Sequence, residues 1–376
     1  MEHYLDNSAT TKVCPEAAEA ALLAMTEVYG NPSSTHTKGR EAKQLLDKSR
    51  KQVADALGCT AQELVFTSCG SESDNWAILN GAELMRRKGM HIISSQVEHD
   101  AVRKSLDELE RRGFEVTRLK PDETGAIPVQ AVVEALRPDT VLVTLMLVNN
   151  ETGAVTDIGA IAKAMKKAGS QALLHTDAVQ AFMKLPFTVK SLGADLVSVS
   201  GHKIHAPKGI GALYIKNGVK LKPYLLGGGQ ENGRRAGTEA MPQIAAFGAA
   251  CQAAKAHLQE NYERMDALRQ LAIDALRRDI PELMVIGGGA PHILSISLPG
   301  WRSEVLMNYM EAQEIYVSKS SACKKGGRSH VLEAIGLAPK VIDGAIRIGL
   351  SRFTTQEDIL ALCAALKEAR SKLAHA

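Results

Sequence analysis

Aromatic residues are scarce in this chain of 376 residues, of which they make up only 4%. Because nucleic-acid bases commonly bind by stacking on aromatic side chains, this scarcity argues against nucleic acid as the main ligand. The charge balance agrees, since 45 Lys and Arg against 42 Asp and Glu leave a formal net charge of +3. Such a small net charge gives no strong field to attract a nucleic acid or an anionic membrane.

Long apolar runs are missing as well. The run Val141–Val148 falls far short of the roughly 18 residues that a membrane-spanning helix requires. The amino-terminal residues Met1–Asp6 lack the basic start and the apolar stretch of a signal peptide. We therefore expect a cytoplasmic protein that does not bind membranes.

Paired cysteines are the third absence. The six cysteines are widely scattered and none forms a Cys-x-x-Cys motif; they stand at positions 14, 59, 69, 251, 323 and 363. This spacing favours neither a zinc site nor a disulfide framework. We therefore expect no metal site, and a reducing compartment fits the chain best.

The chain does contain a regular alternation of short apolar runs with helical segments. The runs are rich in Val, Ile and Leu without strict alternation, which is typical of strands buried on both faces. They are Leu64–Thr67, His91–Ser95, Phe114–Leu119, Val141–Val148, Ala172–Thr176, Asp195–Ser200 and Gly211–Ile215. This order predicts an α/β fold with a mostly parallel, seven-stranded sheet flanked by helices, and with ligands at the carboxyl ends of the strands.

The carboxyl-terminal part of the chain has a different pattern. Residues 240–278 have the periodicity of one long helix, and Ile293–Leu298 alternates like a strand with one exposed face. We expect a large domain over residues 13–259. A smaller α+β domain is predicted from residues 1–12 and 260–376.

A carboxylate and a lysine follow two neighbouring predicted strands, and both are expected at the same edge of the sheet. Asp177 follows the run Ala172–Thr176, and Lys203 follows Asp195–Ser200. A pyridoxal phosphate site needs a lysine that forms the Schiff base and a carboxylate that holds the proton on the ring nitrogen. We therefore assign Lys203 and Asp177 to these roles. The alternative for an isolated His-Lys pair is a surface lysine that follows a strand.

A phosphate site is expected in the turn Thr67–Ser73. Gly70 and Ser71 stand where a strand gives way to a helix, so backbone N–H groups and the helix dipole would face an anion. The simpler interpretation is a serine that only caps the helix. Ser200 and His202, beside the predicted lysine, favour the phosphate interpretation.

Two further turns after strands contain polar side chains. His99 could stack on the cofactor ring and move protons near the substrate. Asn150 offers an amide to cofactor or substrate. The alternatives are a capping histidine and an ordinary asparagine-rich turn.

Cys323 and Arg347 complete the candidate residues. Cys323 lies in a basic, glycine-containing stretch, Ser318–Arg328, whose cations favour the nucleophilic thiolate. Arg347 lies in an apolar run and needs an anionic partner, for which a substrate carboxylate is well suited. The alternative for Arg347 is a structural ion pair.

Taken in order, these motifs resemble the cysteine desulfurases of the NifS/IscS type, within the class V aminotransferase-like group. The similarity runs over nearly the whole length of the chain. It implies the fold of this family, which is the pyridoxal-phosphate-dependent transferase fold type I. It rests on Tyr4–Thr11, Gly30–Ser34, Thr67–Ser73, Glu98-His99, Asn149–Glu151, His175–Gln180, Ser200–Lys203, Pro207–Gly209, Gly227–Glu231, Arg235–Thr238 and Ser321–Cys323.

The resemblance implies a role for each candidate residue around pyridoxal 5'-phosphate. Lys203 corresponds to the Schiff-base lysine, Asp177 to the partner of the ring nitrogen, and Gln180 to the donor to the ring hydroxyl. His99 corresponds to the ring-stacking acid/base. The phosphate ligands implied are Ser71, Ser200, His202 and, from the other subunit of a homodimer, Thr238.

The resemblance also implies how the substrate L-cysteine is handled. Asn150 and Arg347 correspond to the residues that hold its carboxylate, and Cys323 to the sulfur acceptor. The segment after Cys323, Lys324–Ser329, is about two residues shorter than in typical long-loop members of the family. This difference leaves the sulfur-acceptor protein open.

The implied activity is a cysteine desulfurase that gives L-alanine and a persulfide on Cys323. The persulfide sulfur would pass to an iron–sulfur scaffold or a tRNA-thiolation protein. Two alternatives stay open at this point. One is a related lyase, for example on selenocysteine, or an aminotransferase; the other is an interaction scaffold for sulfur-trafficking proteins.

Overall fold

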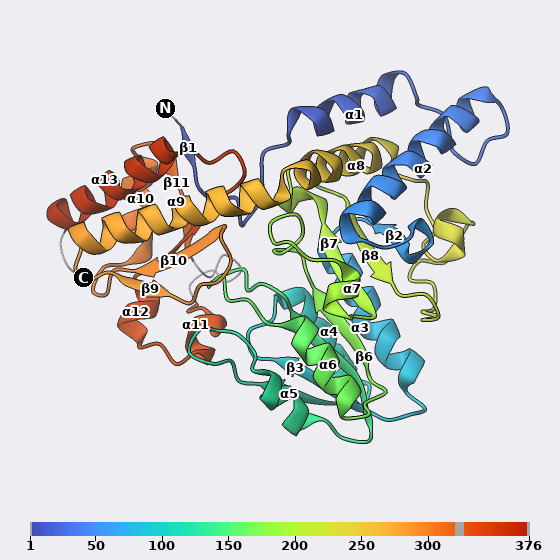
Figure 1. Ribbon diagram of the computed structural model, residues 1–376, viewed down its shortest axis with the longest axis horizontal. Coiled ribbons are helices and arrows are strands. Elements are labelled where there is room, and N and C mark those ends of the chain that lie inside the picture. Colours follow the sequence, from blue (N-terminus) through green and yellow to red (C-terminus); the bar gives the residue numbers. More distant parts are fainter. Residues whose placement is uncertain (1, 320–326, 374–376) are drawn as a thin grey trace.

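Seven strands form the main sheet of the computed structural model, which describes residues 2–319 and 327–373 (Figure 1). Each predicted apolar run corresponds to one strand, with ends that agree to within two residues. The strands are β2 (Leu64–Thr67), β3 (His91–Ser95), β4 (Glu115–Leu119), β5 (Thr140–Met146), β6 (Leu173–Asp177), β7 (Leu196–Ser200) and β8 (Gly211–Ile215). The prediction of an α/β fold with seven strands is confirmed.

The strand order explains why most of this sheet is parallel. It runs β2-β8-β7-β6-β5-β3-β4, and β8 alone runs opposite to the other six strands. The pairing of β6 with β7 places Asp177, at the end of β6, beside Ser198 on β7. The segments that follow the parallel strands therefore leave the sheet along one edge.

Helices cover both faces of the main sheet (Figure 1). Successive residues of a strand point to opposite faces, and Ile92 and Ile93 of β3 accordingly belong to two different buried clusters. The helices on the Ile92 side are α3 (Gly70–Met85) and α4 (Asp100–Arg111). The other cluster includes α5 (Val129–Ala135), α6 (Ile158–Lys167), α7 (Val189–Leu192) and α8 (Met241–Ala256), and α8 packs against α1 (Pro15–Thr26) and α2 (Thr37–Leu57).

A second sheet of four antiparallel strands lies in the carboxyl-terminal part. Its order is β12-β13-β10-β9, and a separate short strand pair joins the amino terminus to this part. The sheet strands are β9 (Met284–Ile286), β10 (Ile293–Ser297), β12 (Ser318–Lys319) and β13 (Ala345–Gly349), and the pair is β1 (His3–Tyr4) with β11 (Ile315–Tyr316). The helices here are α9 (Leu258–Asp279), α10 (Ser303–Glu311), α11 (His330–Ala334), α12 (Pro339–Asp343) and α13 (Gln356–Lys372).

Two expectations for this part were wrong. Residues 240–278 do not form one helix, because His257, at φ −128° and ψ 24°, separates α8 from α9. Nor does Ile293–Leu298 have an exposed face, since every residue of β10 is buried. The serines of this strand face the buried side covered by α12, where Ser297 Oγ donates a hydrogen bond to the carbonyl of Val341.

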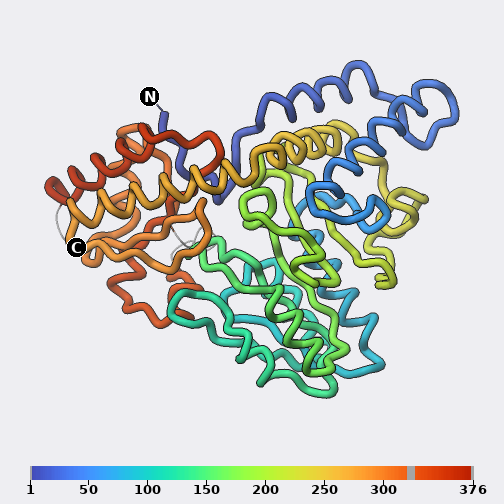
Figure 2. Tube along the Cα trace, in the orientation of Figure 1, coloured from blue at the N-terminus to red at the C-terminus, as the bar shows by residue number. Residues whose placement is uncertain are grey.

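The amino-terminal segment links the two sheets (Figure 2). The Asn7 side chain donates a hydrogen bond of 2.9 Å to the carbonyl of Gly349, on β13. A few residues later, Thr11 N–H donates to the carbonyl of His202, just after β7.

The domain boundaries near residues 12 and 260 stay a prediction. Within the described residues, none of the helices combines the length and the apolar character that crossing a membrane demands.

Replacing Ser297 with Asp tests the burial of β10. Because the Ser297 side chain is fully buried, we expect Ser297→Asp to lower the free energy of unfolding by at least about 2 kcal/mol. The matched control is Met284→Asp at the residue paired with Ser297 on β9, which is 40% exposed. Urea denaturation of both variants is the measurement, and equal stabilities would contradict the fold described here.

Candidate active site

Ten of the predicted site residues line one cavity of about 280 Å³ at the carboxyl ends of the parallel strands. Nine of them lie at or just after the ends of five strands of the main sheet, so this sheet assembles most of the site, and the tenth, Arg347, comes from β13. The ten are Gly70, Ser71, His99, Asn150, Asp177, Gln180, Ser200, His202, Lys203 and Arg347. The cavity is also lined by residues without a predicted role: Ser8, Ala9, Cys69, Asp74, Met146, Val148 and Val179.

Lys203 lies at the end of a short 3-10 turn, Gly201–Lys203, directly after β7. Its Nζ donates hydrogen bonds of 2.7 Å to the carbonyls of both Ser8 and Ala9. These carbonyls belong to the segment that links the two sheets. The amino-terminal segment therefore holds the lysine side chain in the cavity, a contact that the sequence did not predict.

Asp177 ends β6 and is almost fully buried, with 7% of its surface exposed. Burial raises the pKa of its carboxyl, whereas His99, the Val179 N–H and Lys203 lower it. Oδ1 accepts a hydrogen bond of 2.9 Å from the Val179 N–H. Burial disfavours the ionised form of the Asp177 carboxyl. A cationic partner such as a protonated ring nitrogen would stabilise that form in the cavity.

A second buried carboxylate, Asp74, is the fifth residue of α3 and also lines the cavity. Burial, followed by repulsion from Asp177, raises its pKa well above the usual range. Behind the pair, His175 contacts Thr144 and Ser198, and burial lowers the pKa of its imidazole to about 3. Asp74 had no predicted role; its place three residues after Ser71 on the helix was the available signal.

The predicted phosphate turn begins α3. Cys69 is the N-cap residue, and Gly70 and Ser71 are the first helical residues, so their N–H groups have no intrahelical acceptor. A Cβ on Gly70 would lie 2.7 Å from Val179 Cγ2, so this turn has room only for glycine unless Val179 moves. Ser200 Oγ, at the facing strand end, is buried and has no hydrogen-bond partner among the described residues.

His202 lies between this turn and the amino-terminal segment. Its Nδ1 is 3.2 Å from Thr10 Oγ1. Burial, Lys203 and Lys208 lower the pKa of its imidazole to about 4, so it is neutral at neutral pH. A neutral imidazole still has one N–H to donate to an anion.

His99 is the N-cap residue of α4. Its Nδ1 accepts a hydrogen bond of 3.1 Å from the Ala101 N–H, so the proton of the neutral ring is on Nε2. The capping alternative is therefore present in the structure. It does not exclude a ligand contact, because His99 also lines the cavity.

Arg347 reaches the cavity from β13 of the smaller sheet. Its guanidinium donates hydrogen bonds to the carbonyl of Asn150 at 2.8 Å and to Ser318 Oγ at 2.8 Å, and it pairs with Asp6 at 3.2 Å. The structural ion pair considered as the alternative thus exists. Nε remains buried without a partner among the described residues, so the guanidinium retains a donor for a ligand.

Among the described residues, Thr238 is the predicted site residue that does not line this cavity. Thr238 is exposed, outside the cavity of its own chain. The loop before it is attached by ion pairs between Arg235 Nε and Glu72, at 2.9 Å, and between Arg50 and Glu231, at 2.6 Å. Cys323 lies outside the described residues.

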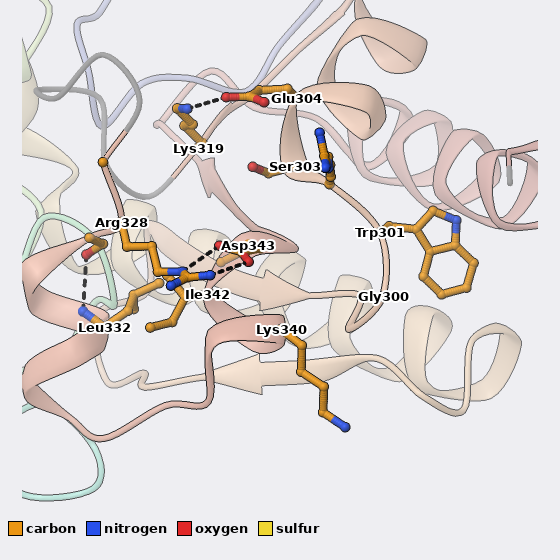
Figure 3. A pocket seen from close by; sticks show the side chains of 14 residues that line it. Gly300, Trp301, Ser303, Glu304, Lys319, Arg328, Leu332, Lys340, Ile342 and Asp343 are labelled. Atoms are coloured by element: carbon orange, nitrogen blue, oxygen red, sulfur yellow. Dashed lines mark hydrogen bonds and ion pairs between the residues drawn. The ribbon is translucent and has the colours of Figure 1, made fainter. Parts of the chain in front are cut away.

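A second cavity, of about 460 Å³, lies beside α10 and α12 (Figure 3). Lys319 pairs with Glu304 at 2.6 Å, and Arg328 pairs with Asp343 at 2.8 Å, on two sides of it. Of the residues that line it, only Lys319, Gly327 and Arg328 belong to the stretch whose cations were expected to favour the Cys323 thiolate. It borders the two described residues, Lys319 and Gly327, that are closest in sequence to the segment containing Cys323.

The lysine, the buried carboxylate and the anion-binding turn define a pyridoxal-phosphate enzyme. A family model described as Aminotransferase class-V matches residues 3–362. Cysteine desulfurase IscS of Methanosarcina thermophila is 43% identical over 361 residues, which cover 95% of this chain and 89% of that protein. The chain belongs to the cysteine desulfurases of the aminotransferase class-V family.

Solved structures agree with this assignment. A structure described as a NifS-like protein has a TM-score of 0.93 and 35% identity, and the match covers 99% of this chain and all of that one. A structure described as SspA in complex with cysteine has a TM-score of 0.82 and 32% identity, covering 94% of this chain and all of that one.

The residues in the cavity fit the cofactor of this family, pyridoxal phosphate. Ser200 Oγ and the amide donors of Gly70 and Ser71 would hold its phosphate. Asp177 would hold the proton on the ring nitrogen, and Lys203 is the amine that would bind the aldehyde. The unpartnered hydroxyl of Ser200 and the raised pKa of the Asp177 carboxyl support two of these assignments.

A Gly70→Ala variant tests the phosphate turn. The added methyl group must displace Val179 or the turn itself, a change that costs about 1–3 kcal/mol in packed sites. We expect pyridoxal phosphate to bind the variant at least about fivefold more weakly, as measured by equilibrium dialysis. Gly81→Ala is the control within the same helix, because its Cβ would meet only ordinary contacts. Equal affinities for both variants would contradict the assignment.

Proposed function

We propose that this enzyme is a cysteine desulfurase that converts L-cysteine to L-alanine and transfers the sulfur to Cys323. The observation that supports it most strongly is the meeting of Lys203, Asp177 and Arg347 in one cavity. An amine and a carboxylate are what the cofactor needs, and a buried guanidinium is suited to an amino-acid carboxylate. The similarity to cysteine desulfurases over 95% of the chain supports the same reaction.

Substrate binding is the first task of the protein. Arg347 would hold the carboxylate of cysteine through its guanidinium, and Asn150, whose carbonyl already accepts from Arg347, would orient it. The substrate would then lie between the main sheet and β13. Holding the carboxylate at one end fixes which side of the substrate faces Lys203.

Proton transfer is the second task. Pyridoxal phosphate, when bound, supplies the electron sink that makes the Cα proton of an amino acid removable. Lys203 Nζ would accept this proton, and His99 would act as acid/base beside the cofactor ring. Asp177 keeps its ionised form when it faces a cationic ring nitrogen.

Sulfur transfer is the third task. The Cys323 thiolate would attack the substrate sulfur, forming an S–S bond while the Cβ–S bond breaks. The electron pair of the broken bond stays on carbon, which takes up a proton and gives alanine. The persulfide on Cys323 would then pass its outer sulfur to a thiol of an acceptor, such as an iron–sulfur scaffold or a tRNA-thiolation protein in the cytoplasm.

Cys323→Ser separates this mechanism from lyase and aminotransferase chemistry. A hydroxyl is not ionised at neutral pH and attacks sulfur poorly, so we expect alanine formation to fall at least about a hundredfold. Binding of pyridoxal phosphate should stay unchanged. Alanine and protein-bound persulfide are measured with L-cysteine as substrate.

Cys69→Ser is the matched control, because Cys69 is a thiol that lines the cavity. It should retain persulfide formation. Release of sulfide at the normal rate from Cys323→Ser would point instead to direct elimination by a lyase.

Thr238 supports the proposal of a homodimer with shared sites. It is exposed in its own chain, on a loop attached near the start of α3, so a partner chain could receive it at its phosphate turn. Each active site would then be complete only in the dimer.

Mixing two inactive variants tests this arrangement. Thr238→Asp should repel the phosphate, and Lys203→Ala lacks the lysine. In a mixed dimer one site would have both wild-type residues, so refolding a mixture should restore about a quarter of the wild-type rate. If Thr238 serves its own chain, mixing restores nothing.

A further inference from the structure

Lys184 is a buried lysine that the reaction as described does not use. Only 5% of its surface is exposed, and it lies one turn after Gln180 in the segment that follows β6. Burial, together with Lys203 and Arg347, lowers its pKa well below the usual range. Its charge also lowers the pKa of the buried His292 ring. A lysine in such basic, apolar surroundings costs stability.

The hydrogen bonds of Lys184 lead to one neighbour. Among the described residues, its Nζ has a single acceptor, Gln180 Oε1, at 3.4 Å. The other end of the same amide donates from Nε2 to the carbonyl of Ser8 at 2.9 Å. Gln180 is itself 95% buried and lines the cavity, so its amide lies between Lys184 and the cofactor site.

The orientation of this amide has a chemical consequence. An amide group has nearly the same shape when its oxygen and nitrogen exchange places, so its neighbours decide which end donates. A backbone carbonyl only accepts, so Ser8 holds the nitrogen end of the amide, and Lys184 Nζ can donate to the oxygen end whether it is an ammonium or a neutral amine. The amide oxygen is then turned toward Lys184, and one N–H of Nε2 remains available to the cavity.

We propose that Lys184 is a positioning residue for the cofactor, which holds the Gln180 amide so that its free N–H faces the ring oxygen of pyridoxal phosphate. The proposal rests on the proposed role of Gln180 as donor to that ring oxygen. It does not depend on which reaction the bound cofactor performs.

This role predicts opposite effects on two quantities. Replacing a buried, poorly paired lysine by an apolar side chain of similar length is often neutral or stabilising for the fold. The same replacement removes the contact that orients Gln180, and so weakens cofactor binding. If Lys184 had a merely structural role, its replacement would lower both the stability of the fold and the affinity for the cofactor, or it would lower neither.

The test uses Lys184→Met, with Lys190→Met as the control at an exposed lysine of the same region. We expect Lys184→Met to raise the dissociation constant for pyridoxal phosphate about threefold to tenfold, the range for one lost hydrogen bond. The visible absorption band of the bound cofactor should shift, because its ring oxygen loses a donor. The urea midpoint of the cofactor-free protein should be unchanged or higher.

Two variants of Gln180 show whether Lys184 acts through it. In a Gln180→Ala background, Lys184→Met should have no further effect on the dissociation constant. Gln180→Glu keeps an acceptor for Lys184 but has no N–H for the ring, so it should weaken binding and shift the band as Lys184→Met does. The Gln180→Glu variant therefore still tests the amide N–H if Lys184→Met fails to fold.

The proposal is overturned if Lys184→Met binds the cofactor with wild-type affinity and an unshifted band. It is also overturned if the loss is equally large in the Gln180→Ala background. Neither result bears on cysteine desulfuration, which is tested separately by alanine formation in Cys323→Ser.

Discussion

The shared edge of the parallel strands is the constraint on which the active site depends. Strands β3, β5, β6 and β7 are neighbours that run in the same direction, and the register aligns Asp177 with Ser198. Their following turns therefore supply His99, Asn150, Asp177 and Lys203 to one cavity. A shift of one residue in any strand would turn these side chains to the opposite face of the sheet.

The amino-terminal segment adds a second constraint, because it connects the two sheets at the cavity. Ser8 and Ala9 accept hydrogen bonds from Lys203, and Asn7 donates to Gly349. Arg347, two residues before Gly349, reaches the same cavity from the smaller sheet. The position of the Arg347 guanidinium relative to Lys203 therefore depends on this short segment.

The main sheet and most of the site could be predicted from the sequence, for a physical reason. Strands buried on both faces leave short, continuous apolar runs, and candidate site residues stand at or just after the strand ends, as Asp177 and Lys203 do. Asp74 and Lys184 could not be found in this way. They lie within a helix and a turn, where only the folded structure shows that their side chains face the cavity or Gln180.

The errors lie where tertiary packing overrides local pattern. The alternation in Ile293–Ser297 predicted an exposed face, but the packing of α12 buries its serines. The helical periodicity of residues 240–278 continued through His257, where the backbone leaves the helical conformation. Neither segment contributes a residue to the lining of the cavity.

The most direct test of the central claim is to locate the bound cofactor on the chain. Borohydride reduction of the enzyme with pyridoxal phosphate would fix the cofactor covalently to the lysine that holds it, and peptide mass spectrometry would identify that lysine. The account predicts a modified peptide that contains Lys203. Modification of another lysine instead, such as the neighbouring Lys184, or no modification at all, would contradict it.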